Sequence, residues 1–225
     1  MSIGDAEIKT QERVVRFFKD PEILGYQYIG NLSDQQNKNI KEDRLRQYLR
    51  LKGYADKLID GAITQLQQES GNLSRGLYDA NKTVYSRLKY GIPVSESPEK
   101  PPVTVQLIDE ENPLNNDFAI AEEVTVVEQS EKRPDLVVYL NGVAVAVIEL
   151  KRSSISVSEG IRQNLTNQKN TFIQSFFSTM QFCMAGNESE GLRYGTLLTG
   201  EKFYMEWKDD GFKEHEEERD PVDVR

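Results

Sequence analysis

The sequence is poor in the residues that build disulfide frameworks, metal clusters and imidazole-based catalytic sites. Its 225 residues include one cysteine, Cys183, and one histidine, His215. A single cysteine excludes an intrachain disulfide framework, and one cysteine with one histidine excludes a structural zinc site. The lone imidazole also disfavours Ser–His and Cys–His catalysis. Any chemistry is therefore expected to use carboxylates, lysines and amides.

Long apolar runs are lacking as well. No stretch approaches the roughly 18–20 apolar residues needed to cross a bilayer. The N-terminus, MSIGDAEIKTQERVVRF, has no basic segment followed by an apolar one, so no signal peptide is predicted. These features predict a globular cytoplasmic protein with no membrane partner.

Acidic residues outnumber basic ones, 37 to 28, for a formal net charge of −9. The excess is concentrated in residues 95–131, which contain ten acids and one base, while the rest of the chain has 27 of each. A negative total argues against a nucleic-acid partner only when the charge is evenly spread. A local DNA-binding surface is therefore not excluded. The basic residues of 40–52 spread around a predicted helix, which is typical of an ordinary solvated surface.

Hydrophobic periodicity changes along the chain from helical to strand-like. Helices are predicted over residues 7–18, 40–52, 54–67, 80–89 and 158–170, the first with Thr10 as its N-cap. Residues 91–116 hold five prolines and are predicted to form a loop or meander. Strands are predicted over residues 118–128, 135–140, 143–150, 180–185, 193–199 and 203–207. The fold class is therefore α/β, a mixed sheet flanked by helices on both faces and preceded by a helical portion.

Charged side chains end a strand that is otherwise apolar on both faces. The segment VAVAVIEL closes with Glu149 and Leu150, and Lys151 follows. Glu149 and Lys151 point to the same face because they are two residues apart. Burying them is costly unless they pair or meet a ligand. Asp135 opens the neighbouring strand, and two carboxylates beside a lysine suit Mg²⁺ and an activated water.

The hairpin register decides whether Asp135 shares that face. Asn141-Gly142 predicts a hairpin between the two strands. A strict two-residue turn places Asp135 opposite Ile148, on the other face from Glu149. We therefore predict a three-residue connection with Gly142 at positive φ, as in a type I turn with a G1 bulge. A two-residue turn without a bulge elsewhere would count against a shared metal site.

These residues resemble the PD-(D/E)xK nuclease signature: Pro134-Asp135, a hairpin, then Glu149-Leu150-Lys151. The wider string of RPDLVVYLNG, IELKR, a glutamine in a polar helix, RYGT and FYMEW resembles the N-terminal nuclease domain of type I restriction-enzyme R subunits. The resemblance covers most of the chain and is strongest over residues 112–208. It implies a restriction-endonuclease-like fold and Mg²⁺-dependent cleavage of double-stranded DNA.

The resemblance also implies roles for particular residues. Asp135 and Glu149 would hold Mg²⁺ together with the Leu150 carbonyl, and Lys151 would position or activate the attacking water. Gln163 would be the glutamine of a Q-xxx-Y element that contacts phosphate and catalytic residues.

The match is incomplete on that helix. Asn167 occupies the tyrosine position, and the alternative pair of Gln168 and Phe172 has an aromatic ring without a hydroxyl. Glu12 resembles an acidic residue on the first helix of this fold that can contact a metal or its waters. A solvated first-turn acid is the competing interpretation of Glu12. Arg152 and Arg162 flank the predicted site and are candidates for contacts with the DNA backbone.

The sequence patterns and the resemblance together divide the chain into a helical portion (1–92) whose first helix packs on the core, a Pro-rich connection (93–116), a nuclease core (117–208) and an acidic tail or linker (209–225). No GxxxxGK[ST] is present, so ATP would be used only by a helicase motor outside this chain. The resemblance implies that motor, together with methyltransferase (M) and specificity (S) subunits, as partners. No base-reading motif is visible, so cleavage is expected to lack sequence specificity.

Other interpretations stay open. Asp135 can simply begin a strand, and Glu149 with Lys151 can form a salt bridge at a sheet edge. The domain as a whole can be a non-catalytic docking unit of the complex. It can also be a different enzyme on the same fold, such as a repair nuclease or a nickase.

Overall fold

The structure is a computed structural model that describes residues 3–208, with side chains from residue 8 onward. The predicted acidic tail (209–225) and His215 lie outside the described residues. The helices are α1 (Ile3–Lys19), α2 (Glu42–Leu51), α3 (Asp56–Gly71), α4 (Leu77–Tyr90) and α5 (Val157–Asn167), with short 3-10 helices η1 (Pro113–Asn115), η2 (Gln174–Thr179) and η3 (Glu201–Phe203). The strands are β1 (Gln27–Asn31), β2 (Ile92–Val94), β3 (Val103–Val105), β4 (Phe118–Glu122), β5 (Val126–Val127), β6 (Glu131–Lys132), β7 (Leu136–Leu140), β8 (Val143–Leu150), β9 (Phe182–Asn187), β10 (Gly191–Gly195) and β11 (Met205–Glu206).

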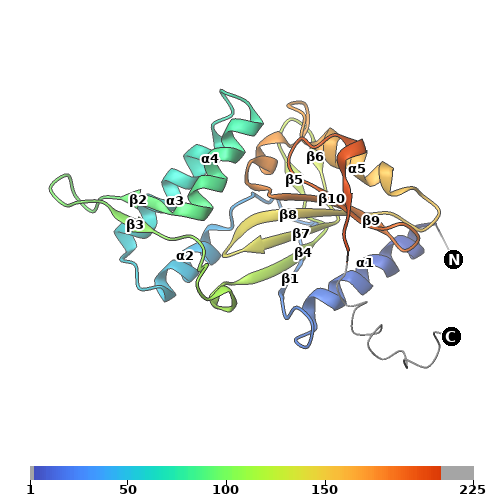
Figure 1. The fold of residues 1–225 in the computed structure, drawn as a ribbon, viewed down its shortest axis with the longest axis horizontal. Helices are drawn as coiled ribbons and strands as arrows, with labels where there is room; N and C mark the ends of the chain where they lie inside the picture. Colours follow the sequence, from blue (N-terminus) through green and yellow to red (C-terminus); the bar gives the residue numbers. More distant parts are fainter. Residues whose placement is uncertain (1–2, 209–225) are drawn as a thin grey trace, which may run out of the picture.

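A seven-stranded mixed sheet organises the molecule in the order β1-β4-β7-β8-β9-β10-β11 (Figure 1). The β1–β4 and β8–β9 pairs are parallel, and the other neighbours are antiparallel. β8 lies at the centre, and seven of its eight residues are buried. Apolar side chains on both faces of this strand are required because helices cover the sheet from both sides.

Helix α1 packs on one face of the sheet and α5 on the other (Figure 1). Val15 of α1 joins a buried cluster with Ile120, Leu136 and Ile148. On the opposite face, Ile161 of α5 packs with Ala185. The predicted α/β class with helices on both faces is confirmed.

Helices α2, α3 and α4 build a second apolar core next to the sheet. Leu45, Ile59 and Val84 are among its buried members, and Val143 at the start of β8 belongs to the same cluster. The isolated bridge between Ile40 and Val143 ties the approach to α2 directly to the sheet. The helical portion is therefore continuous in packing with the sheet.

Four predictions about the elements are wrong in part. α1 begins at Ile3, so Thr10 is not an N-cap but a buried mid-helix residue whose Oγ1 lies 3.3 Å from Glu188 Oε1. Strand β1 was not predicted, because its sequence QYIGN is half exposed and carries no alternation. The Pro-rich segment contains the β2–β3 hairpin, which forms because Ile92 and Val105 are both fully buried. The strand predicted over 118–128 breaks after Glu122, at a residue in a left-handed conformation (Glu123, φ 49°).

The β7–β8 connection differs from the predicted three-residue loop. Leu140 pairs with Val143, so the turn has two residues, Asn141 (φ 51°) and Gly142 (φ 84°). Positive φ at both positions is what a type I′ turn needs. The extra residue sits within the strand instead: Tyr139 pairs with Ala144 and Val138 with Ala146, which leaves Val145 as a bulge. The hairpin at Asn141-Gly142 and the positive φ of Gly142 were predicted correctly, whereas the length of the connection was not.

The bulge shifts the register of everything beyond it. Leu136 faces Ile148, so Asp135 and Glu149 are the next facing positions along the two strands. The condition set by the sequence, a bulge elsewhere if the turn has two residues, is therefore met.

Within residues 3–208, the structure contains no helix long and apolar enough to span a bilayer.

Candidate active site

The predicted residues Asp135, Glu149 and Lys151 meet where β7 begins and β8 ends. Asp135 Oδ2 accepts a hydrogen bond of 2.7 Å from the backbone N–H of Leu150. Lys151 Nζ lies 4.0 Å from the same Asp135 oxygen and donates to the Leu150 carbonyl at 3.1 Å. Together with Gln163 of α5, these residues are named the strand-end cluster.

Glu149 is the most deeply placed member of the strand-end cluster, with no exposed surface. Burial raises the pKa of Glu149 well above its ordinary value, and the neighbouring charge of Asp135 raises it further, while Lys151 acts in the opposite direction. Its Oε1 atom has no hydrogen-bond donor in the described part of the chain. Burying a carboxylate costs free energy that a neighbouring cation offsets.

Gln163 brings α5 into the cluster. Its Nε2 donates to Glu149 Oε2 at 2.6 Å. α5 begins at a capped end, where Ser156 accepts from the Ser158 N–H. Gly160 lets the helix approach the sheet, since a Cβ there would meet Ala185 Cβ at 3.0 Å and Glu149 Cβ at 3.4 Å. The helix therefore places its glutamine over the end of β8.

Asn167 and Gln168, the other residues considered for the Q-xxx-Y element, are both buried in the fold. Asn167, at the tyrosine position, is buried at the end of α5. Gln168 is also buried, and its Oε1 accepts from the Leu198 N–H at 2.7 Å. Gln168 thus holds the segment after β10, and of the two glutamines it is Gln163 that contacts Glu149.

Glu123 borders the cluster and was not anticipated from the sequence. Its N–H donates to the Asp135 carbonyl at 2.8 Å, and the next residue, Val124, donates to the Pro134 carbonyl at 3.1 Å. The Glu123 carboxylate pairs with Arg133 at 2.9 Å and contributes to the raised pKa of Glu149. The left-handed backbone of Glu123 lets the end of β4 hold the Pro-Asp dipeptide. No sequence signal marks a non-glycine residue for this conformation.

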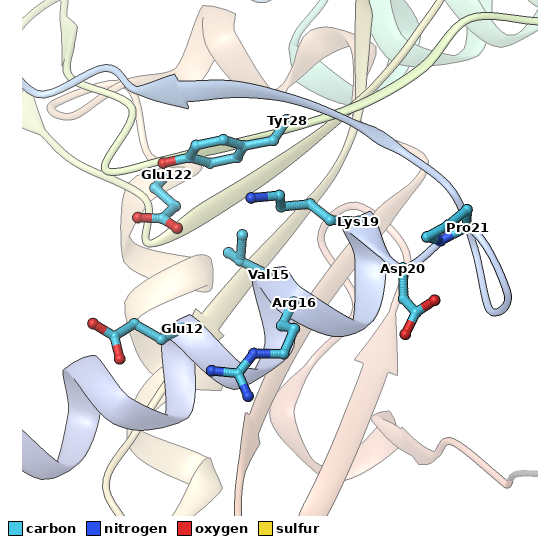
Figure 2. A pocket seen from close by; sticks show the side chains of 8 residues that line it. All are labelled: Glu12, Val15, Arg16, Lys19, Asp20, Pro21, Tyr28 and Glu122. Carbon is cyan, nitrogen blue, oxygen red and sulfur yellow. The ribbon is translucent and has the colours of Figure 1, made fainter.

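Three further candidates lie apart from these contacts. Glu12 lines a pocket of about 500 Å³ between α1 and the sheet, where Figure 2 shows it on the helix below Glu122. Arg162 is held by Glu201 at 2.8 Å and by Glu159 at 2.8 Å, so its charge is already compensated. Arg152 is half-buried next to the cluster and has no ion pair among the described residues.

The cluster has the donor set that a hard divalent cation takes. Asp135 and Glu149 are facing positions at the ends of neighbouring strands, and Glu149 Oε1 has no donor in residues 3–208. The Leu150 carbonyl lies beside them, in contact with the Lys151 ammonium. Carboxylate and carbonyl oxygens are the ligand types that Mg²⁺ takes in proteins, so these residues fit the metal.

The chain is similar in sequence to proteins of type I restriction enzymes. The chain is 29% identical over 137 residues to a protein of Methanocaldococcus jannaschii named as the endonuclease subunit of a type I restriction enzyme, MjaIXP. That alignment covers 56% of this chain and 13% of the relative, so the chain corresponds to a small part of the relative's length. The family model described as type I restriction enzyme R protein N terminus (HSDR_N) matches residues 9–203, and the chain therefore belongs to this family.

Proposed function

We propose that this chain is the Mg²⁺-dependent endonuclease domain of a type I restriction enzyme, and that it cleaves both strands of DNA without a sequence preference of its own. The observation that carries the proposal is the strand-end cluster. Two carboxyl groups from neighbouring strands face each other, Lys151 lies 4.0 Å from one of them, and Gln163 contacts the other. Membership of the R-subunit family supports DNA as the substrate.

Asp135, Glu149 and the Leu150 carbonyl would hold the metal. A bound Mg²⁺ would supply Lewis-acid polarisation of the phosphate and lower the pKa of a bound water. Asp135 is fixed for this task by the Leu150 N–H, and Glu149 by Gln163. Both carboxylates are therefore oriented before the substrate arrives and need little reorganisation during the reaction.

Lys151 is placed to act on the attacking water and on the developing charge. Its side chain is mostly buried, and the Leu150 carbonyl orients the ammonium group. In the reaction, the water oxygen forms a bond to phosphorus and gives up a proton to solvent, while the bond from phosphorus to the leaving oxygen breaks and that oxygen takes up a proton. The products are a phosphate end and a hydroxyl end. An ammonium group beside the phosphate stabilises the extra negative charge of the transition state.

The surroundings of this activity are part of the proposal. We propose that ATP-driven movement belongs to a helicase motor elsewhere in the subunit, and that M and S subunits complete a cytoplasmic restriction complex. The family description and the naming of the longer relative as one subunit of a type I restriction enzyme support a complex of several subunits. ATP would act only in the motor.

The test uses the assembled restriction complex with Asp135→Ala and Lys151→Ala. Plasmid cleavage and ATP hydrolysis are measured together in Mg²⁺. We expect cleavage to fall by at least about a hundredfold with ATP hydrolysis unchanged, because these groups act on the scissile phosphate alone. Lys38→Ala, an exposed lysine without an ion pair in residues 3–208, serves as the matched control and should cut normally.

If both variants still cleave the plasmid, the nuclease proposal is wrong and the chain is a non-catalytic docking domain of the complex. Cleavage that stops at nicked circles would instead identify a nickase. Strand-resolved gels of the same plasmid distinguish these outcomes.

A further inference from the structure

The exposed face of α4 carries a regular row of tyrosines and lysines. Tyr78, Lys82, Tyr85 and Lys89 follow one another at spacings of four, three and four residues. At about 100° per residue they lie within an arc of about 60° on the helix surface. All four are exposed, with Tyr78 at 61% and Tyr85 at 49%. This set is named the α4 stripe.

The remaining faces of α4 are used for packing. Leu77, Ala80, Val84 and Leu88 are buried against the rest of the protein. Asn81 donates to the Ser178 and Met180 carbonyls, and Arg87 makes two hydrogen bonds of 2.8 Å to Glu69. The stripe is therefore the one side of the helix with no structural task in residues 3–208.

Positive charge on the stripe is not neutralised, unlike the charge on α2. Arg44, Arg46 and Arg50 of α2 each form an ion pair with an acidic residue. Lys82 has no ion pair among the described residues. The only acid on α4, Asp79, pairs with Arg75 at 3.5 Å.

The charge of the surrounding segment has the same sign. Residues 40–91 contain ten basic and six acidic residues in a chain whose net charge is −9. Acids return only at the far end of the stripe, where Lys89 lines a pocket with Asp109, Glu110 and Glu111. Lys82, between two tyrosines, is therefore the lysine of the stripe that lies away from these acids.

We propose that the α4 stripe binds the phosphate backbone of duplex DNA, at a place separate from the strand-end cluster. Lysine ammonium groups and tyrosine hydroxyls are both common donors to phosphate oxygens. Lys82 and Lys89 are about 10.5 Å apart along the helix axis, close to the rise of three base steps, about 10 Å. No hydrogen bond occupies the hydroxyl of Tyr78 or Tyr85 within the described structure. Exposed aliphatic side chains, which a protein partner would bury, are missing from this face.

The stripe lies away from the chemistry. Figure 1 shows α4 toward one end of the molecule and α5, which carries Gln163, toward the other. A contact at α4 would therefore hold the duplex without touching the scissile phosphate. The inference rests on the proposed function only in taking DNA as the ligand.

The test is metal-free binding of the full 225-residue chain to a fluorescently labelled duplex, followed by anisotropy over a range of salt concentrations. Lys82→Glu is expected to weaken binding about tenfold and to lower the salt slope by about one, because one phosphate contact is lost. Tyr85→Phe, which removes only a hydroxyl, should give a smaller loss and leave the slope unchanged. Lys100→Glu is the matched control, since Lys100 is already paired with Glu96 in an acidic region.

The outcomes of this experiment test the α4 proposal independently of the catalytic proposal. Asp135→Ala tests the catalytic proposal alone and should lose cleavage whether or not the α4 stripe binds DNA. Unchanged affinity and salt slope in Lys82→Glu, with a normal thermal melt, would overturn the α4 proposal. Lost binding in Lys82→Glu together with full cleavage by Asp135→Ala would instead overturn the catalytic proposal alone.

Discussion

At the scale of single residues, two fully buried ionisable side chains, Glu149 and Cys183, differ in the groups that can compensate their charge. Glu149 is fully buried, yet one of its oxygens has no donor in the described chain, and Gln163 holds the other. Cys183 pairs across the sheet with Val147 on the neighbouring strand and is also fully buried. Ionising either group without compensation is costly. The carboxylate has a lysine and a proposed metal site to compensate it, whereas the thiol has neither.

Cys183 is therefore expected to be inert in the folded protein. Burial raises the pKa of its thiol to about 12, and the charge of Glu149 adds to the effect. Because thiolates are the reactive form, a disulfide reagent at a pH of about 8 should label almost none of the native chain. After unfolding in guanidinium, the single cysteine should react completely. Rapid labelling of the native protein would contradict the described packing around β9.

At the scale of elements, segments with a clear hydrophobic periodicity were predicted from the sequence, and segments with a weak periodicity were missed. The helices α2 to α5 and strands β7 and β8 were all located, because each has a clear apolar pattern. β1, β2 and β3 are short, and their pairing comes from tertiary contacts such as the buried contact of Ile92 with Val105. Glu149 and Lys151 were named from the sequence because strand alternation places them on one face, whereas Gln163 was named from the resemblance to the Q-xxx-Y element. The bulge at Val145 and the conformation of Glu123 depend on packing and have no local signal.

Gly142 joins the hairpin to α2 and should not tolerate a side chain. Its φ is 84°, and a Cβ would lie 2.7 Å from both Leu45 N and Lys41 O. We expect Gly142→Ala to lower the free energy of unfolding by about 2–4 kcal/mol through backbone strain and displacement of α2. Denaturant titration measures the change.

Gly71→Ala is the matched control for this substitution. Gly71 ends α3, and a Cβ at this position would meet nothing within 4 Å. Its substitution should change the free energy of unfolding by less than about 1 kcal/mol. Equal effects of the two substitutions would show that the contact with α2 does not restrain the turn.

At the scale of the whole molecule, the helical portion and the sheet form a continuous packing unit. β1 pairs with β4 at one edge of the sheet, and Val15 of α1 covers Ile120 and Leu136. Near residue 92 the sequence pattern changes from helical to strand-like. Residues on both sides of this predicted boundary contribute to the sheet and to the helices that cover it. The family match over residues 9–203 spans the same unit.

A fragment of residues 93–208 is therefore not expected to fold. It would expose the α1 face of the sheet and leave β4 without its parallel neighbour. Loss of this buried apolar area removes more free energy than the marginal stability of a domain provides. Circular dichroism should show no cooperative thermal transition for the fragment, in contrast to the full chain. A sharp transition for the fragment would establish residues 93–208 as an independent folding unit.

Because of the bulge at Val145, Asp135 and Glu149 share one face of the sheet only while the number of residues between them stays odd. Six residues of β8 precede Glu149, while five residues of β7 follow Asp135, and the unequal count is what brings the two side chains to one face. Removing any single residue between the two acids would turn one of them to the other side of the sheet. Changes of length in this hairpin are therefore compatible with a shared metal site only in pairs, or where a new bulge restores the odd residue.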